Sequence, residues 1–525
     1  MSKLPSLSSV LNAGQRQSLF IGICTFFTAI LLLAMVSIVL LIFARGGGYF
    51  WPEDIQQLQF VRASDDQPIT AYGQYQNQFE QGGEPVRWVV YSHARNPYGN
   101  QTLLDDTNLL QARLAPEAAR ISLRDGRAIL GEPLKVTAPS DPDVSLNRLA
   151  QRLTQVRQIE QSIAGIRDEQ LADIHQKLTE LDQRKVGKKA PARLTLNQGF
   201  DRWHKRILTL EKQRDAYQLF VRLADQSIVS VALIEVEHLV YPGQLSGWQK
   251  LGEALYEVGG FLSESPKQAN TAGGVFPALF GTVLMVFLMT IIVTPFGVLA
   301  AIYLNEYASN NGLIAVIRIA VSNMAGVPSI VYGVFGLGFF IYGVGGNIDA
   351  LFFEANLPAP TLGTPGVFWA SLTMAILTLP VVIVATEEGL RNVPQGLKAG
   401  SYALGATKAE TVLYTILPMA SPGIMTGVIL AIARAAGEVA PLMLVGAVKF
   451  APNLPIDAEF PYLHLERQFM HLGVLIYDGA FHSQTDAKGA SMMFAACLLL
   501  LVVVFVLNIL AVLLRTKLRK RYHKG

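Results

Sequence analysis

The chain has 525 residues, of which 51% are hydrophobic and 16% charged, and its formal net charge is +3. Because the apolar residues come in long runs, this composition excludes an ordinary soluble protein and favours a membrane protein with several spans. Both cysteines, Cys24 and Cys497, lie inside apolar runs, and the sequence has no Cys/His spacing typical of a metal site. We therefore expect neither a disulfide framework nor a bound metal or cofactor.

The first apolar run is a candidate membrane anchor. It covers 20–43, and its 24 uncharged residues are enough to cross about 30 Å of hydrocarbon. It ends in FARGGG instead of a small-x-small cleavage site, which favours a retained anchor over a cleaved signal peptide. Lys3 and Arg16 lie in the preceding segment, 1–19, and predict a cytoplasmic N-terminus by the positive-inside rule.

Residues 46–265 are a large polar insertion, which is expected in the periplasm. Its first part alternates between apolar and polar residues as strands do, in three runs: 58–63, 68–75 and 86–92. Gly- and Pro-containing stretches at 82–85 and 96–100 predict turns beside these runs.

The second part of the insertion has a helical pattern. Apolar residues recur at spacings of three and four on both sides of a turn at 186–193, which predicts an antiparallel helical hairpin at about 145–224. The run 227–242 is rich in β-branched residues and predicts a further strand. Together these patterns indicate an α+β domain, β-rich with an inserted hairpin. The hairpin's charges fit either a partner surface or a solvated face, and the domain's isolated histidines predict no metal site.

Five further apolar runs are expected to span the membrane within 271–514. They are 275–304, 313–342, 367–386, 422–447 and 489–514. With the anchor this makes six spans, so both termini are expected in the cytoplasm. The basic tail 515–525 fits that side as a topology anchor next to the membrane lipid, without a nucleic-acid partner. The expected fold class is an α-helical polytopic membrane protein with an α+β domain between spans 1 and 2.

Two ionisable residues lie deep in an expected span. Arg434 follows about twelve residues into 422–447, near the membrane midplane at about 1.5 Å per residue, and Glu438 comes one turn later. Charges at that depth cost several kcal/mol unless they are paired or hydrated, so they face protein or a cavity. They form either a structural pair or part of a solute pathway, in which the guanidinium would bind an oxyanion through two parallel hydrogen bonds.

The segment 387–421 is a polar stretch between two expected spans, and the alternation of spans places it in the cytoplasm. It is rich in helix formers and interrupted by Gly and Pro, which indicates a folded loop large enough to be a docking surface. The sequence contains no GxxxxGK[ST] motif, so we expect no enzyme activity, and ATP hydrolysis on a separate subunit.

This loop resembles the cytoplasmic coupling loop of binding-protein-dependent ABC importer permeases. By that resemblance the residues of the ATPase-coupling motif are Ala399, Gly400, Ser401, Gly405, Ala406, Leu417 and Pro418. Gly405 corresponds to the motif's glycine, and Pro418 is expected to end the coupling helix before the next span. Two positions depart from the motif, because Ala399 stands where an acid is usual and Thr415 where a hydrophobic residue is usual. We therefore expect docking to depend on shape more than on a charge at that position.

Further segments are similar to PstA-type phosphate permeases and occur in consistent order. They are TAGGVFPALFGT, PFGVLAAIYLNEYA, VPSIVYGVFGLG, LPVVIVATEEGLRNVP and GIMTGVILAIARAAGEVAPLM. The similarity covers about 257–514, whereas 46–256 is absent from the usual short form of the family.

The resemblance implies the transmembrane permease subunit of an ATP-driven importer of inorganic phosphate, which couples ATPase closure to alternating access in a bacterial inner membrane. It implies three kinds of partner: a PstC-type homologous permease, two PstB-type ATPase subunits and a PstS-type periplasmic phosphate-binding protein. One hypothesis is that the periplasmic insertion guides the binding protein. The alternatives are a membrane-anchored scaffold or sensor whose periplasmic domain reads a ligand or partner, and a permease for another oxyanion.

Overall fold

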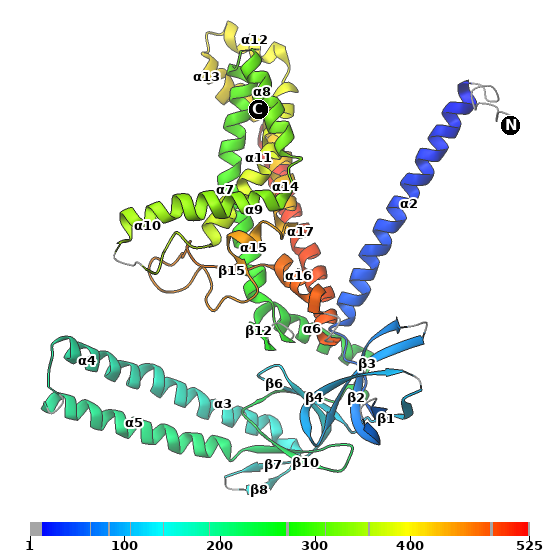
Figure 1. Cartoon of the computed structure of the whole chain (residues 1–525), viewed down its shortest axis with the longest axis vertical. Helices are drawn as coiled ribbons and strands as arrows, with labels where there is room; N and C mark the ends of the chain where they lie inside the picture. Colours follow the sequence, from blue (N-terminus) through cyan, green and yellow to red (C-terminus); the bar gives the residue numbers. More distant parts are fainter. Residues whose placement is uncertain are drawn as a thin grey trace.

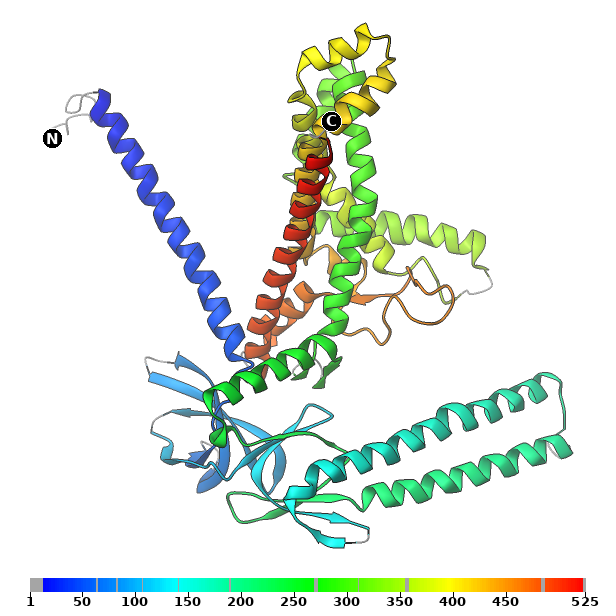
Figure 2. The same cartoon turned by 180° about the vertical axis from the view of Figure 1, so that it is seen from behind.

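The computed structural model describes residues 13–62, 65–81, 84–105, 107–139, 141–187, 190–268, 272–309, 311–354, 358–482 and 487–522. The first twelve and last three residues of the expected cytoplasmic ends therefore lie outside the described residues. The chain forms an upright bundle of helices, with a β-rich domain and a long helical hairpin at one end of it (Figure 1, Figure 2).

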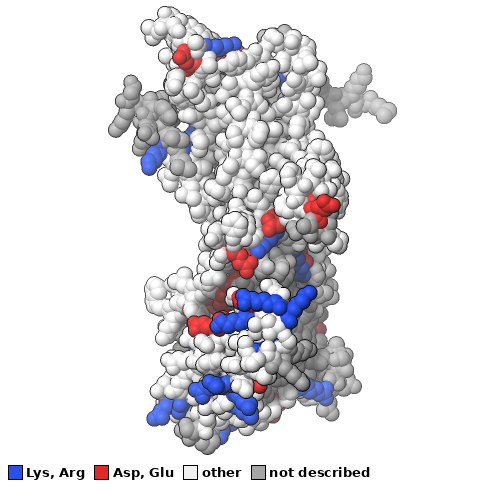
Figure 3. Space-filling view, turned by 90° about the vertical axis from the view of Figure 1, so that its left-hand side faces the viewer, with Lys and Arg blue, Asp and Glu red and all other residues white. Residues whose placement is uncertain are grey.

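Six helical segments of the described chain are long and apolar enough to cross a membrane. They are Gln17–Gly48, Phe276–Tyr307, Ser329–Phe352, Val367–Arg391, Lys408–Gly437 and Ser491–Lys517. Together with the β-rich domain between the first and second segments, they confirm the expected fold class. Figure 3 shows that one face of the bundle is almost free of charged side chains, whereas Lys, Arg, Asp and Glu gather on the domain below it.

Helix α2 (Ala13–Gly48) leans away from the rest of the bundle (Figure 1). Its apolar side chains are exposed. It meets the bundle only near its C-terminal end, among the contacts that the structure describes. There a Cβ placed on Gly46 would lie 2.7 Å from the carbonyl oxygen of Phe494, at the start of α17 (Ala487–Tyr522). The exposed apolar length of α2 is what a helix surrounded by lipid requires.

The core of the bundle lies between α7 (Phe276–Ile302), α11 (Val367–Arg391) and α14 (Leu417–Gly437). Buried side chains from all three helices meet there, including Met289, Met374 and Ala431. Small residues bring α11 and α14 close together, because a Cβ on Gly423 would lie only 2.5 Å from the Cα of Gly389. Such small-residue contacts are a common way to pack helices within a membrane.

The close contact between Gly423 and Gly389 predicts that a larger side chain at position 423 lowers the stability of the bundle. We expect Gly423→Val to destabilise the bundle by about 1–3 kcal/mol, because the clash is with backbone that cannot rotate away. Thermal unfolding of the purified protein in detergent measures the effect. Gly22→Val is the matched control, since Gly22 of α2 has nothing within 4 Å of its Cβ position. Equal unfolding temperatures for the two variants would contradict the described packing.

The span expected at 313–342 differs in the structure, where two helices replace it. Helix α8 (Gly312–Met324) ends before an irregular stretch at 325–328, and α9 (Ser329–Phe335) then begins a continuous helical rod. The rod continues through a π-helical stretch, Gly336–Gly345, into α10 (Gly346–Phe352). Pro328 explains the break, because proline disfavours helical backbone in the residue before it and has no N–H to donate.

The expected span at 422–447 is also displaced. Its helix begins earlier, as α13 (Lys408–Thr411), continues through a π-helical stretch, Val412–Ile416, into α14, and stops at Gly437. A short helix, α15 (Leu442–Val445), follows the break. Two short strands, β14 (Ala447–Val448) and β15 (Phe469–Met470), form a parallel pair within the helix bundle. Further short elements are α16 (Leu472–His482) and the antiparallel pair β12 (Pro266–Lys267) and β13 (Ala272–Gly273).

The soluble domain contains two antiparallel sheets. The first has the order β4-β3-β2-β1-β5, from β1 (Gln56–Arg62), β2 (Asp65–Gln81), β3 (Glu84–His93), β4 (Asn96–Asp105) and β5 (Leu109–Leu114). The second has the order β10-β9-β7-β6-β11, with β8 paired to β7. Its strands are β6 (Ala119–Leu123), β7 (Ala128–Ala138), β8 (Asp141–Val144), β9 (Gln218–Arg222), β10 (Ile228–Ala232) and β11 (Val236–Val240).

Two expectations for this domain need correction. The stretch 96–100 was expected to be a turn, but it begins β4, and the turn lies two residues earlier because His93 pairs with Asn96. The single strand expected at 227–242 is two strands, β10 and β11, which lie at opposite ends of the second sheet. The chain turns between β10 and β11, where Leu233 and Val236 are both buried in the core of this sheet.

The helical hairpin extends sideways from the second sheet (Figure 1). Its first arm is α3 (Leu149–Gly165), a π-helical stretch, Ile166–Leu171, and α4 (Ala172–Gln183), and its second arm is α5 (Pro191–Asp215). Ile163, Leu171, Ile207 and Leu210 form its buried seam. The spacing of these apolar residues holds the two arms together as an antiparallel pair.

Candidate functional site

Arg434 lies level with the middle of α11. Helices α11 and α14 run antiparallel, with Gly423 against Gly389 and Gly427 against Ala385. Two helical turns further, this register brings Arg434 to the level of Thr378. Thr378 in turn lies 3.5 Å from the sulfur of Met289, near the middle of α7. Arg434 therefore lies level with the middle of two spanning helices, and its depth in the membrane stays a prediction.

Helix α14 stops within one turn after Arg434. Its last residue is Gly437, and Glu438 has extended backbone, with φ −81° and ψ 136°. The expected pair on one continuous helical face is therefore corrected to a cation on the last helical turn and a carboxylate just beyond it. Gly437 and Pro441 explain the break, because glycine favours helix ends and proline lacks a donor.

Arg434 and Glu438 form a loose ion pair. Arg434 Nε lies 3.7 Å from Glu438 Oε1, which is too long for a hydrogen bond. The Nε atom is buried, and no described residue accepts a hydrogen bond from it. The side chains keep 34% and 24% of their surface exposed, so the guanidinium retains donors that an oxyanion can reach.

A second break in the membrane helices lies against the first. A Cβ placed on Gly333 of α9 would lie 2.7 Å from the Cα of Pro441. The hydroxyl of Tyr332, next to Gly333, donates a hydrogen bond of 2.8 Å to the carbonyl of Met324, across the stretch 325–328. Irregular backbone at membrane depth is tolerated where it is enclosed by protein or lines a cavity. The sequence analysis did not identify Tyr332 as a site residue, although Pro328 could have indicated the helix break that it spans.

The expected coupling motif is a surface helix and turn. Ala399 and Gly400 are exposed on α12 (Gln395–Ala403), and Ser401 shares a hydrogen bond of 2.9 Å with Thr411 at the start of the next helix. Gly405 adopts φ +88°, which a residue with a side chain rarely does, and so it makes the turn between the helices. Leu404 beside it is 91% exposed, which makes it the most prominent apolar side chain of this surface.

The later residues of the motif differ from the expectation. Ala406 precedes α13, whose capping box is formed by Thr407 and Glu410. Leu417 and Pro418 lie inside a continuous helix instead of ending a separate one. The π-helical stretch Val412–Ile416 just before them explains how, since a wider turn accommodates the proline ring and its missing donor.

A buried ion pair fastens α12 to the second span. Lys398 Nζ lies 2.6 Å from Glu306 Oε1, and the two side chains are only 12% and 9% exposed. Glu306 belongs to the π-helical stretch Tyr303–Tyr307 that ends α7, and Lys408 Nζ lies 4.8 Å from the ring centre of Tyr307. The sequence reasoning missed this pair, although Glu306 stands out as an acid in the short loop between two apolar runs.

Comparisons with known proteins show which proteins this chain is similar to. The model of the family "Binding-protein-dependent transport system inner membrane component" matches residues 293–520. "Phosphate transport system permease protein PstA 1" of Mycobacterium tuberculosis is 32% identical over 286 residues, which are 54% of this chain and 84% of that protein. "Phosphate transport system permease protein PstA" of Yersinia pestis is 32% identical over 252 residues, 48% of this chain and 75% of that protein.

A third relative is similar over a shorter length. "Probable phosphate transport system permease protein PstA" of Methanocaldococcus jannaschii is 32% identical over 187 residues, which are 35% of this chain and 60% of that protein. The matched family segment contains both candidate features, the break at Arg434 and the helix α12.

Proposed function

The chain belongs to the PstA-type branch of the binding-protein-dependent ABC importer permeases, and from this premise we propose how it works. It is the membrane permease subunit of an importer of inorganic phosphate. We assign inorganic phosphate as the substrate because the chain is 32% identical to a phosphate permease over 84% of that protein's length. Neither the fold nor the comparisons favour the alternative of an anchored scaffold or sensor.

The pathway lies at the two adjoining helix breaks. Arg434 supplies the positive charge there, with a guanidinium that is only loosely paired to Glu438. A planar guanidinium donates parallel hydrogen bonds to phosphate oxygens, which suits a tetrahedral oxyanion better than a point charge does. Glu438 limits how tightly the anion is held, since an ionised carboxylate repels it. Weak holding at an intermediate site favours release, which transport needs.

The movement of the ATPase during ATP hydrolysis is transmitted to this chain through α12. The exposed residues of α12 and the turn at Gly405 form a surface for an ATPase subunit, and Leu404 is its apolar centre. The buried pair of Lys398 and Glu306 joins this surface to the end of α7, so displacement of α12 moves a spanning helix. Rigid elements linked by buried contacts are how such displacements are transmitted.

The family implies ATPase and solute-binding partners in an inner membrane. We assign these roles to two PstB-type ATPases on the cytoplasmic side and a PstS-type binding protein on the periplasmic side. A PstC-type permease completes the pathway. Both termini lie in the cytoplasm, and the soluble domain lies in the periplasm.

The docking role of Leu404 predicts a specific loss of binding. We expect Leu404→Asp to reduce copurification of the ATPase at least about tenfold, equivalent to about 1.4 kcal/mol, because a charge replaces an apolar contact. Quantifying the ATPase retained by the affinity-purified chain measures this. The matched control is Leu110→Asp, an exposed leucine of β5 in the soluble domain. Full retention of the ATPase by the Leu404 variant would refute the assigned surface.

A further inference from the structure

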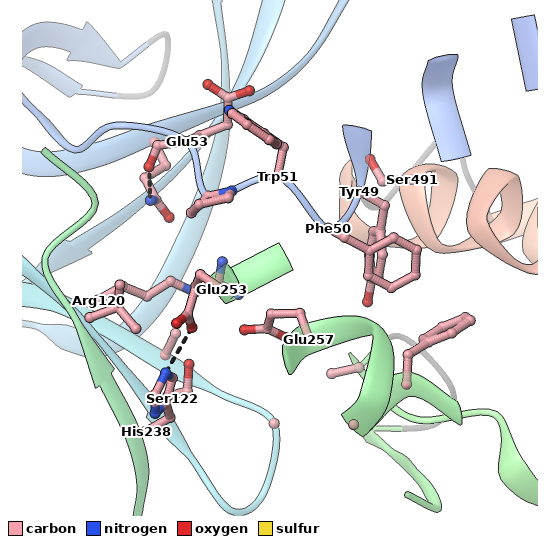
Figure 4. A pocket seen from close by; sticks show the side chains of 18 of the residues that line it. Tyr49, Phe50, Trp51, Glu53, Arg120, Ser122, His238, Glu253, Glu257 and Ser491 are labelled. Carbon is pink, nitrogen blue, oxygen red and sulfur yellow. Dashed lines mark hydrogen bonds and ion pairs between the residues drawn. The ribbon is translucent and has the colours of Figure 1, made fainter. Parts of the chain in front are cut away.

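The helix bundle and the soluble domain meet around a cavity of about 310 Å³ (Figure 4). Its walls come from the last turn of α2 and the segment after it, from β6 and β11, from α6 (Gly247–Ser263), and from Ser491 of α17. The ends of two candidate spans therefore border it, which puts it at the level where the bilayer surface meets the domain. Its volume is at the low end of the range of about 300–1,000 Å³ for small-molecule sites.

Most charged side chains of this cavity are already paired. Lys267 lies 3.0 Å from Glu237 and 2.9 Å from Glu264, and His238 Nε2 lies 2.7 Å from Glu253. These pairs join β11 and β12 to α6 and close the walls of the cavity.

In contrast to these paired residues, Arg120 of β6 and Glu257 of α6 have no partner among the described residues. Both side chains are half-buried and line the cavity, and neither makes an ion pair or hydrogen bond with a described residue. Figure 4 shows them entering the cavity from opposite sides. Arg45 and Glu53 also line the cavity without a described side-chain partner, but both are exposed. Among the half-buried charged residues that the structure describes there, Arg120 is the unpaired cation and Glu257 the unpaired anion.

The phenol of Tyr49 lies within the electrostatic reach of both charges. Burial raises the pKa of its phenol to about 12, the guanidinium of Arg120 opposes that rise, and the carboxylate of Glu257 adds to it. Tyr49 follows the last turn of α2 and packs against Phe261 of α6, with ring centres 5.8 Å apart. A ligand in this cavity would therefore meet opposite charges and an aromatic wall.

The helix beside the cavity has the character of a membrane-surface helix. Trp248, Leu255 and Tyr256 of α6 are 84%, 64% and 57% exposed, which leaves an apolar face open. Amphipathic helices with exposed Trp and Leu lie in the plane of the bilayer surface, at the depth of the headgroups. The acyl chains of a lipid whose headgroup entered the cavity would have apolar surface to follow.

We propose that this cavity binds the headgroup of a zwitterionic phospholipid with a primary ammonium group, of the phosphatidylethanolamine type. Arg120 pairs with the phosphate diester, and Glu257 accepts hydrogen bonds from the ammonium. A choline headgroup lacks those N–H donors, and an uncharged glycerol headgroup leaves Glu257 without a cation. The bound lipid fastens the soluble domain to the bundle. This inference does not depend on the proposed transport function.

The test measures lipid binding to the delipidated full chain in detergent by native mass spectrometry. We expect phosphatidylethanolamine to bind at least about tenfold more tightly than phosphatidylcholine or phosphatidylglycerol. Arg120→Gln and Glu257→Gln should each abolish this preference. Arg113→Gln and Glu117→Gln, which change residues of the same domain outside the cavity, should retain it.

Three results would overturn the proposal. Equal affinity for the three lipids would show that the cavity does not select a headgroup. Loss of the preference in the control variants would show that the preference depends on the folding of the domain and not on Arg120 and Glu257. Free phosphoethanolamine forms the soluble arm of the experiment. If it saturates the site while the lipid does not bind, the ligand is a soluble zwitterion and the lipid assignment is wrong.

Discussion

Glu306→Gln is expected to lower ATP-driven phosphate uptake at least about tenfold, because it leaves the ammonium of Lys398 buried without a counter-charge. Removing one partner of a buried pair typically costs about 3–5 kcal/mol, which is enough to shift α12 away from the end of α7. ATP hydrolysis by the assembled complex should fall much less, since the ATPase retains its own site. The ratio of phosphate imported to ATP hydrolysed in proteoliposomes measures the effect.

The double variant Glu306→Gln, Lys398→Gln is expected to recover part of the uptake, because it removes both buried charges together. The matched control is Lys177→Gln, which breaks an ion pair with Asp173 on the hairpin. That pair is more than half exposed, so its loss is expected to matter little. If the ratio of phosphate to ATP is unchanged in Glu306→Gln, α12 is not coupled to α7 through this pair.

Arg434→Ala is expected to reduce uptake at least about tenfold, because the pathway then loses its only guanidinium at that level among the described residues and leaves Glu438 to repel the anion. Arg434→Lys keeps the charge but not the planar pair of donors, so it should recover only a small part of the rate. The initial rate of phosphate uptake at saturating ATP is the measurement.

A second variant separates a solute contact from a structural pair. If Arg434 only neutralises Glu438, then removing both charges in Arg434→Ala, Glu438→Ala should restore uptake. We expect no recovery, because the phosphate contact is still missing. Recovery to near the wild-type rate would assign the pair a purely structural role.

Hydropathy predicted the membrane part of the fold because long apolar runs have few alternatives to spanning helices. It failed at the helix breaks, since each break lies within a long, mostly apolar run: 325–328 contains no charged residue, and Glu438 is the one charged residue of 438–441. Pro328 and Pro441 mark both breaks in the sequence. A proline within an apolar run is equally compatible with a kinked, continuous helix, however, as Pro380 within α11 demonstrates.

The soluble domain was harder to predict, because its strands contain residues that usually indicate turns. Gly99 lies within β4, and Gly131 and Pro133 lie within β7. The sheet accommodates Pro133 at a shift of register between β7 and β9. The pairing of distant strands, such as β7 with β9 across the whole hairpin, leaves no local pattern in the sequence.

Within the candidate site, the residue types were predictable and their partners were not. The spacing of the coupling motif identified Gly405, whose φ of +88° strongly favours a residue without a side chain. The ion pair of Lys398 and Glu306 joins residues far apart in the chain, and only the packing of α12 against α7 brings them together. The cavity at the domain junction likewise depends on segments that are distant in the sequence, from the end of α2 to Ser491 of α17.

The most direct test of the central claim is uptake of radiolabelled phosphate into proteoliposomes that contain this chain, its partner permease, the ATPase and the phosphate-binding protein. We predict uptake that requires ATP and the binding protein and that falls sharply in Arg434→Ala. Uptake no greater than that of vesicles lacking this chain would contradict the assignment of the chain as the phosphate permease.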